Sequence, residues 1–354
     1  MKVGIVGFAG SGKTTVFNTL TGLSAEVGSY SSRHGRVNLG IIKVPDERVD
    51  RLAKIYNPKR KVYAEINFVD FAGPEGGATK GAASSLDPRA VQDMREVEAL
   101  VHVVRGFDNP MLSIAPDPVR DINNFEVELI LSDLVPTEKR LERFKKEKGN
   151  EREKEVIEKC HAQLEAEKAL RYLDLSDEEW KLVAGFRFLS QKPILLLLNL
   201  SEADISRGAP EEVVRLAESK NLKLITMCGK AEMEIAELEP EEQGEFLRDL
   251  GISEPARDRF IRAAYQLLDL ISFLTVGEDE CRAWTIKRGT SAHRAAGKVH
   301  SDIERGFIRA EVVTYEDLIN CGSEAKCREA GKLRLEGKDY IVQDGDVIHF
   351  RFNV

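Results

Sequence analysis

The chain alternates between two hydrophobic patterns over much of its length. Short apolar runs have the length and composition of buried strands, at 2–6, 65–69, 99–105, 193–198 and 222–225. Between them, apolar residues recur at helical spacing. Val16, Phe17 and Leu20, for example, would share one face of a helix over 14–21. Buried strands separated by helices predict an α/β domain with a largely parallel sheet.

A charged region interrupts this alternation between 126 and 179. Four apolar residues predict a seam along one helix: Leu134, Val135, Leu141 and Phe144. Three leucines predict a second helix: Leu164, Leu170 and Leu173. We therefore expect an antiparallel helical arm over 126–179 and another amphipathic helix over 174–188. The charges on the arm are either a solvated face or a binding surface.

The last part of the chain alternates with period two and indicates short strands. The expected strands lie at 281–286, 310–313, 340–342 and 348–352, around one helix at 292–303. Asp344-Gly345 favours a tight turn after the third of these strands. The pattern predicts a small β-grasp-like α+β domain over 273–354. The α/β domain would then comprise 1–125 and 180–272, with the helical arm inserted at 126–179.

Composition narrows the class of protein. Hydrophobic residues make up 42% of the 354 residues, and the net charge is −8, so overall charge gives no argument for nucleic acid binding. No apolar run reaches the length of a membrane span, and the longest, around Leu196, is only long enough for a strand. The five cysteines lack C-x-x-C spacing. We expect free thiols, no membrane association and a cytoplasmic location.

A glycine-rich turn joins the first strand to the first helix. Residues 7–14 read G-F-A-G-S-G-K-T and fit G-x-x-x-x-G-K-[ST]. Backbone N–H groups of such a turn and the helix N-terminus bind phosphates, Lys13 would reach the β- and γ-phosphates, and Thr14 would bind Mg²⁺. The alternative, a chance glycine-rich turn, does not explain the strand and helix on either side.

A second motif, D-F-A-G, follows the strand at 65–69. Asp70 would hold Mg²⁺ through water, and Gly73 would offer its backbone N–H to the γ-phosphate. On its own this motif marks many turns, but behind a phosphate loop it indicates a nucleotide site.

The third motif, Asn199-Leu200-Ser201-Glu202, stands where related GTPases usually have N-K-x-D. Glutamate is longer than aspartate and fits guanine poorly, whereas the Asn199 amide can pair with adenine-type groups. Alternatively, Asn199 only caps the next helix and Glu202 is solvated. Cys228, after the strand at 222–225, lies where a loop would cover the base, but a buried small residue is an equal reading.

Together these residues resemble the YchF or Obg-like ATPase family of P-loop proteins. The resemblance rests on G-x-x-G-S-G-K-T-T, D-F-A-G, N-L-S-E, N-L-G-I-I-K-V-P-D-E-R-V-D at 38–50 and a long signature from R-A-W-T-I-K-R-G-T to the C-terminus. That last part resembles the TGS domain of the family. The fold it implies is a P-loop NTPase core of the Ras-like, Obg type with the helical arm inserted and a C-terminal TGS domain.

The resemblance implies slow, Mg²⁺-dependent hydrolysis of ATP, with ATP favoured over GTP, and association with ribosomes. By position, Gly10, Ser11, Gly12, Lys13, Thr14 and Thr15 would hold the phosphates. Asn199, Leu200 and Glu202 would frame the adenine. Pro74 stands where Ras-like GTPases carry a water-orienting glutamine, and family members also lack a polar group there.

Two positions depart from the family. Its members usually carry a threonine shortly before N-x-G, where this chain has 34–37, H-G-R-V. They also tend to carry a histidine in the loop before D-P-V-R-D, where this chain has 109–116, N-P-M-L-S-I-A-P, with Met111. His102, on the strand at 99–105, is better explained as a core residue than as a base.

Six basic residues lie between 287 and 309: Lys287, Arg288, Arg294, Lys298, Arg305 and Arg309. They either contact rRNA phosphates of the large ribosomal subunit or form ordinary surface charge. Three hypotheses follow for function. The first is a slow ATPase that acts as a nucleotide switch at the ribosome, the second an ATP-dependent binding module that hardly hydrolyses, and the third a GTPase.

Overall fold

The structure, a computed structural model, describes residues 1–22, 38–71, 86–146, 149–252 and 254–353. The chain divides into two compact units, Met1–Ile41 with Asn67–Ala263 and Ile42–Ile66 with Ala264–Val354. Each unit is built around its own six-stranded sheet. Residues 42–66, which the sequence pattern placed in the α/β domain, thus group with the C-terminal residues.

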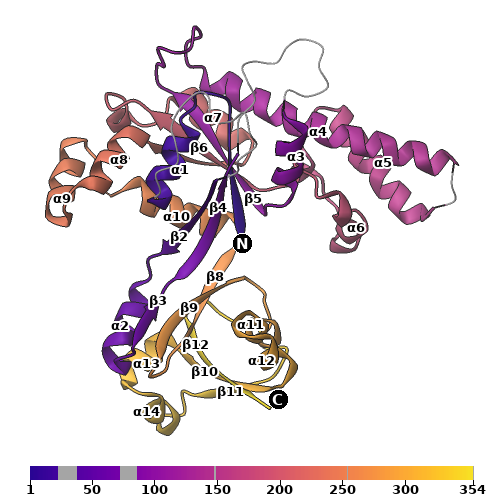
Figure 1. The fold of residues 1–354 in the computed structure, drawn as a ribbon. Helices are drawn as coiled ribbons and strands as arrows, with labels where there is room; N and C mark the ends of the chain where they lie inside the picture. The colour runs from indigo at the N-terminus through magenta and orange to yellow at the C-terminus, as the bar shows by residue number, and fades with distance from the viewer. Residues whose placement is uncertain (23–37, 72–85, 147–148, 253, 354) are drawn as a thin grey trace. The chain divides into compact units, whose positions relative to one another are not determined.

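The first sheet has the strand order β2-β4-β1-β5-β6-β7 (Figure 1). Its strands are β1 (Lys2–Val6), β2 (Asn38–Val44), β4 (Ala64–Asp70), β5 (Ala99–Gly106), β6 (Ile194–Leu200) and β7 (Lys223–Met227). β1 pairs in parallel with β4 and β5, β5 with β6, and β6 with β7. Every residue of β6 is buried, which explains its continuous apolar run. The five predicted strands of the α/β domain are confirmed.

Helices lie on both sides of this sheet (Figure 1). They are α1 (Lys13–Thr21), α3 (Pro88–Arg95), α4 (Pro118–Lys146), α7 (Glu211–Ser219), α8 (Gly229–Glu237), α9 (Pro240–Asp249) and α10 (Ala256–Leu267). α1 and α8 pack together on one side, whereas α3 and α4 lie on the other. No helix among the described ranges is both long and apolar enough to cross a membrane.

The helical arm is formed by α4 and α5 (Glu151–Glu165), which pack against each other. Leu134 and Leu141 contribute to its apolar core as predicted, but Val135 is exposed. The second predicted helix is shorter than expected. α5 ends at Glu165, and Leu170 lies in a 3-10 turn over Leu170–Tyr172.

The segment after the arm is also less helical than predicted. Over 174–188, helix is limited to α6 (Asp177–Leu182) and a 3-10 turn at Ala184–Phe186. Its apolar residues Val183 and Phe188 belong to the same core as α5, so this segment covers the arm's seam near its base. Apolar spacing alone did not reveal that the chain turns here.

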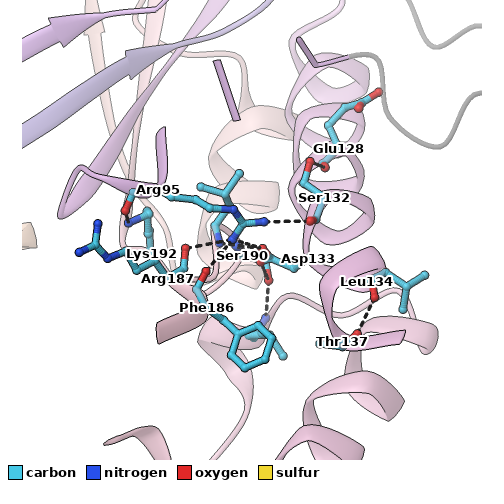
Figure 2. Close-up of polar contacts among 12 residues, drawn as sticks. Arg95, Glu128, Ser132, Asp133, Leu134, Thr137, Phe186, Arg187, Ser190 and Lys192 are labelled. Carbon is cyan, nitrogen blue, oxygen red and sulfur yellow. Dashed lines mark hydrogen bonds and ion pairs between the residues drawn. The ribbon is translucent and has the colours of Figure 1, made fainter. Parts of the chain in front are cut away.

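A buried carboxylate connects α4 to α3 and to the segment that precedes β6. Asp133, with no exposed surface, accepts hydrogen bonds from the backbone N–H groups of Leu189 and Ser190 at 3.0 and 2.7 Å, and from Ser190 Oγ at 2.8 Å. Arg95 of α3 donates to its Oδ1 at 3.0 Å (Figure 2). Arg95 also donates to the carbonyl of Ser132 at 2.9 Å. One aspartate therefore joins three separate segments.

The second unit has a mixed sheet with the strand order β11-β10-β12-β8-β9-β3. Its strands are β3 (Arg60–Val62), β8 (Leu270–Thr275), β9 (Glu280–Lys287), β10 (Phe307–Thr314), β11 (Arg334–Glu336) and β12 (Asp346–Phe352). Its helices are α2 (Glu47–Tyr56), α11 (Ala292–Val299), α12 (Ser301–Arg305), α13 (Tyr315–Cys321) and α14 (Glu324–Glu329). α11 packs on one face of the sheet, and α2, α13 and α14 contribute to the apolar core on the other.

The predicted α+β class of the C-terminal part is confirmed, with three local corrections. The helix expected over 292–303 is interrupted at His300, whose backbone is extended at φ −162°. The strand expected at 340–342 is only an isolated bridge between Ser291 and Ile341. The chain also adds α2 and β3 from residues 42–66, which no local pattern assigned to this part. Gly345 has φ +82°, as the predicted turn requires.

Candidate nucleotide-binding site

The glycine-rich turn lies at the carboxyl end of β1, directly before α1. Gly10 and Gly12 have φ of +75° and +87°, which side chains rarely adopt. A Cβ on Gly7 would lie 2.4 Å from the carbonyl oxygen of Val103, and one on Gly12 would lie 2.3 Å from Nδ2 of Asn199. The backbone conformation and the close packing therefore both require glycine.

Lys13 is buried in the first turn of α1. Its Nζ donates a hydrogen bond to the carbonyl of Phe8 at 2.8 Å, which bends the side chain back over the turn. Burial lowers the pKa of Lys13 to about 8, although the charge of Asp70 acts in the opposite direction. Burial deprives the Lys13 ammonium group of water, and a carbonyl carries no full negative charge. A phosphate would supply that charge, so the site favours binding of an anion.

Asp70 is the last residue of β4, beside Ile5 of β1. Its Oδ2 accepts hydrogen bonds from Thr14 Oγ1 at 3.2 Å and from Asn38 Nδ2 at 3.4 Å. Its Oδ1 is buried without a hydrogen-bond partner among the described residues, as is Ser11 Oγ. Burial raises the pKa of Asp70, and Lys13 opposes that shift. The sequence motifs placed Asp70 and Thr14 together, but they gave no role to Asn38.

These residues fit a magnesium ion. One carboxylate and one hydroxyl meet beside the phosphate loop, and one buried oxygen of the carboxylate has no partner in the described ranges. Magnesium typically binds in this way, through one or two protein oxygens together with water and phosphate oxygens. No cluster of three His, Cys, Asp or Glu residues occurs in the described parts of the chain, which is unlike an all-protein metal cage. Asp70 and Thr14 would hold the ion, which would neutralise phosphate charge.

Asn199 connects two distant loops at the end of β6. Its Nδ2 donates to the carbonyl of Ser11 at 3.1 Å, and its Oδ1 accepts from the backbone N–H of Gly229 at 3.0 Å. The side chain is buried. Each end of the amide keeps one further donor or acceptor position, so direct pairing with a base stays a prediction. The structure instead gives Asn199 a positioning role between the phosphate loop and the start of α8.

The other predicted base contacts lie near Asn199 but differ in exposure. Glu202 is exposed and forms an ion pair with Lys230 at 3.5 Å. Leu200 and Cys228 are buried and belong to the apolar core of this unit. Burial raises the pKa of the Cys228 thiol. Cys228 therefore has the features of a core residue, and its predicted contact with the nucleotide stays untested.

The loop between β5 and α4 covers the phosphate loop, and sequence reasoning missed its contacts. Asn109 Nδ2 lies 3.4 Å from the carbonyl of Gly10, and a Cβ on Gly10 would come within 2.7 Å of Leu112. The buried Arg105 fixes this loop through a 2.7 Å bond to the carbonyl of Ile114. Met111, in the same loop, is 83% exposed.

His102 lies on β5 beside Val6. Its ring stacks on Phe125 with centroids 4.2 Å apart, and burial lowers its pKa to about 3. It is therefore a neutral core residue, as predicted, although its Nε2 has no partner in the described part of the chain.

The remaining predicted site residues are Thr15, Gly73 and Pro74. Thr15 is half-buried in α1. Gly73, Pro74 and the segment 34–37 lie outside the described residues, so their predicted roles are untested.

Known proteins resemble this chain at both ends and over its whole length. One family model, described as a 50S ribosome-binding GTPase, matches residues 2–135, and the YchF GTPase C-terminal model, described as a protein of unknown function (DUF933), matches residues 270–353. The protein of Bacillus subtilis (strain 168) named ribosome-binding ATPase YchF is 43% identical over 100% of both chains. The chain belongs to the YchF family.

Other YchF proteins agree. The Escherichia coli O157:H7 protein, also named ribosome-binding ATPase YchF, is 42% identical over 100% of this chain and 99% of its own. The YchF GTPase of Schizosaccharomyces pombe has a solved structure with a TM-score of 0.86 and 32% identity, over 99% of this chain and 97% of that one. The resemblance seen in the motifs is confirmed, as is a P-loop NTPase core with a helical insert and a C-terminal mixed-sheet domain. A P-loop NTPase binds a nucleotide. The relatives from Bacillus subtilis and Escherichia coli are named ATPases, whereas the Schizosaccharomyces pombe protein is named a GTPase.

Proposed function

We propose that this YchF protein hydrolyses ATP slowly with Mg²⁺ and acts as a ribosome-associated nucleotide switch. One observation carries the nucleotide part. The buried Lys13 lies beside Asp70, whose Oδ1 has no partner among the described residues, at a turn whose glycines have no room for a Cβ. Phosphates and Mg²⁺ satisfy both groups at once. The ribosome part rests on the relatives from Bacillus subtilis and Escherichia coli, which are named ribosome-binding ATPases.

The reaction we propose is attack of water on the γ-phosphate, releasing ADP and phosphate. Lys13 and the N–H groups of the glycine turn stabilise the charge that develops on the phosphate oxygens. Asp70 and Thr14 hold the ion. No described residue stands out as a base, because His102 is buried and neutral. The turnover is therefore expected to be slow without a partner.

ATP is the proposed nucleotide because Glu202 replaces the aspartate that pairs with guanine in N-K-x-D. Glu202 is exposed at the end of β6, close to the Asn199–Gly229 connection. Leu200 and Glu202 would flank the adenine. Asn199 would act by holding Gly229 in place.

The test measures phosphate release from ATP and GTP by the full chain with Mg²⁺, alone and with ribosomes. Lys13→Ala is the control. Release from ATP above that control supports the enzyme, and release at the control level in both conditions contradicts it. Faster turnover with ribosomes supports the switch.

A second candidate function is an ATP-dependent binding module with little hydrolysis. The exposed Met111 in the loop beside the phosphate turn favours it, since that loop carries no histidine. Single-turnover hydrolysis measured beside nucleotide affinity separates the two. Tight ATP binding with no hydrolysis, even with ribosomes, would establish the module.

A further inference from the structure

A buried arginine lies near the end of β5, beside the strand that carries Asn199. Arg105 is 5% exposed, and in the parallel pairing of β5 with β6 it lies opposite Asn199, which binds the carbonyl of Ser11 in the phosphate loop. Val101 and Val103, at alternate positions earlier on the same strand, are buried apolar residues. A residue that only filled this part of the core would also be apolar, so Arg105 needs another explanation.

The contacts of Arg105 do not balance its charge. Nη2 donates a hydrogen bond of 2.7 Å to the carbonyl of Ile114, in the β5–α4 loop (residues 107–117), and a carbonyl carries no full negative charge. Nη1 is buried and has no hydrogen-bond partner among the residues that the structure describes. Burying a cation costs free energy, whereas a hydrogen bond from a cation is about twice as strong as a neutral one. Arg105 therefore holds this carbonyl firmly, although its burial does not favour the stability of the core.

The β5–α4 loop lies against the phosphate loop. A Cβ on Gly10 would lie 2.7 Å from Cδ1 of Leu112, and one on Gly12 would lie 3.8 Å from a ring carbon of Phe107. Asn109 Nδ2 donates to the carbonyl of Gly10 at 3.4 Å. Three side chains of the β5–α4 loop therefore lie close to two glycines whose φ is positive.

Restraint of these glycines should strengthen phosphate binding. Glycine loses more conformational freedom than any other residue when its backbone becomes fixed. A turn that its neighbours already hold in place loses less entropy when its N–H groups bind a phosphate. The β5–α4 loop supplies such neighbours, and Arg105 fixes that loop close to the start of α4.

We propose that Arg105 is a positioning residue for nucleotide binding. By holding Ile114, it keeps the β5–α4 loop against Gly10 and Gly12, and it thereby slows the release of a bound nucleotide. The proposal rests on the proposed binding of a nucleotide at the phosphate loop, but not on hydrolysis or on the choice of base. It does not require contact between Arg105 and the nucleotide.

The experiment measures how fast ADP labelled with an N-methylanthraniloyl group leaves the full chain in the presence of Mg²⁺ and excess unlabelled ADP. Arg105→Met removes the charge and the donors but keeps a long side chain. Arg89→Met, at an exposed position of α3, is the matched control. Leu112→Ala weakens the contact of the loop with Gly10 and changes no buried residue, since Leu112 is 36% exposed.

Arg105→Met should release the nucleotide about tenfold faster than the wild type, because the loop loses a charged hydrogen bond, whereas Arg89→Met should leave the rate unchanged. Leu112→Ala should release it about threefold faster, and the combined variant should be no faster than Arg105→Met alone, because both substitutions act through the same loop. A general loss of stability would not produce this non-additive result.

The proposal is overturned if Arg105→Met releases the nucleotide at the control rate, or if the effects of the two substitutions are fully additive. Thermal unfolding shows whether each variant is folded. If Arg105→Met is not, Arg105→Gln replaces it in both comparisons, because it lacks the charge but keeps a polar side chain. A wild-type chain that binds no labelled ADP contradicts the proposed nucleotide binding and this inference together, whereas binding with unchanged release in the variants contradicts this inference alone.

Discussion

Asp133 and Asp70 are both buried aspartates in the first unit, but their surroundings differ. Both oxygens of Asp133 are engaged, by Arg95, by Ser190 and by two backbone N–H groups. Asp70 has two weak contacts on one oxygen, and the other oxygen has no hydrogen-bond partner among the residues that the structure describes. A buried polar group without a partner costs stability. Asp133, whose oxygens are all hydrogen-bonded, therefore stabilises the fold. Asp70, which has fewer partners among the described residues, has the features of a ligand-binding residue.

The largest expected effect comes from removing the satisfied carboxylate. Asp133→Ala removes the only carboxylate that pairs with Arg95 among the described residues, leaves the Ser190 N–H without its acceptor, and should lower the free energy of unfolding by about 3–5 kcal/mol. Denaturant unfolding measures it. Glu138→Ala, at an exposed position of the same helix, is the control and should change stability by less than about 0.5 kcal/mol. Equal effects of the two substitutions would remove the distinction drawn here.

Asp70→Asn should lower activity strongly and change stability little, the reverse of what is expected for Asp133→Ala. The substitution removes the charge of a buried carboxylate that has few partners in the described part of the chain, so the stability of the ligand-free protein should stay within about 1 kcal/mol. Mg²⁺-dependent ATP hydrolysis should fall roughly 100-fold, because the ion loses its carboxylate. Thermal unfolding with and without Mg²⁺-ATP, beside phosphate release, measures both. A large loss of stability without ligand would place Asp70 in the same class as Asp133.

The third prediction concerns Lys13, beside Asp70, and the pH dependence of the free energy of unfolding. Its pKa is about 8 when folded, below the usual 10.5, so between these values the unfolded chain binds more protons. The stability of the ligand-free protein should therefore rise from pH 8 to 10 through this group, and charged Lys13 costs stability below pH 8. Lys13→Met should stabilise the ligand-free protein at pH 7 by about 2 kcal/mol, and the gain should shrink by pH 10.

Denaturant unfolding at both pH values checks this, with the exposed Lys139→Met as control. A gain that is the same at both pH values would show that packing, and not charge, is responsible.

The smallest expected effect is at Glu202. Glu202→Asp shortens the side chain toward the guanine-pairing length and should shift the ratio of ATP to GTP affinity about tenfold toward GTP. Stability should hardly change, since Glu202 is exposed and its ion pair with Lys230 is a surface one. Titration of both nucleotides measures the ratio. An unchanged ratio would remove Glu202 from base selection.

The sequence predicted the parts that local chemistry determines. The apolar runs predicted the strands of the first sheet, and the glycines predicted the turn whose φ values and packing exclude side chains. It did not predict the break at His300, because apolar spacing continues through α11 and α12. It also missed the contacts of Asn38 and Asn109, since a polar side chain in a loop does not indicate which oxygen it will meet.

The position of β3 was the hardest to predict. Arg60–Val62 is three residues long, and it pairs with β9, more than 200 residues later in the chain. A short strand carries no signal for so distant a partner. The bonds from the Asn199 amide to Ser11 and Gly229 were likewise not predicted, and its contact with the base stays a prediction.

The pairing of β3 with β9 also has a consequence for synthesis of the protein. Val49 and Leu52 of α2 are buried against residues such as Cys281 and Ala283. Since domains generally fold as units during synthesis, the segment 42–66 leaves the ribosome early but must wait for β9 before its apolar face is covered. A nascent or truncated chain that stops before residue 264 would expose that face to chaperones and to other chains. The N-terminal portion of this protein is therefore poorly suited to be made alone.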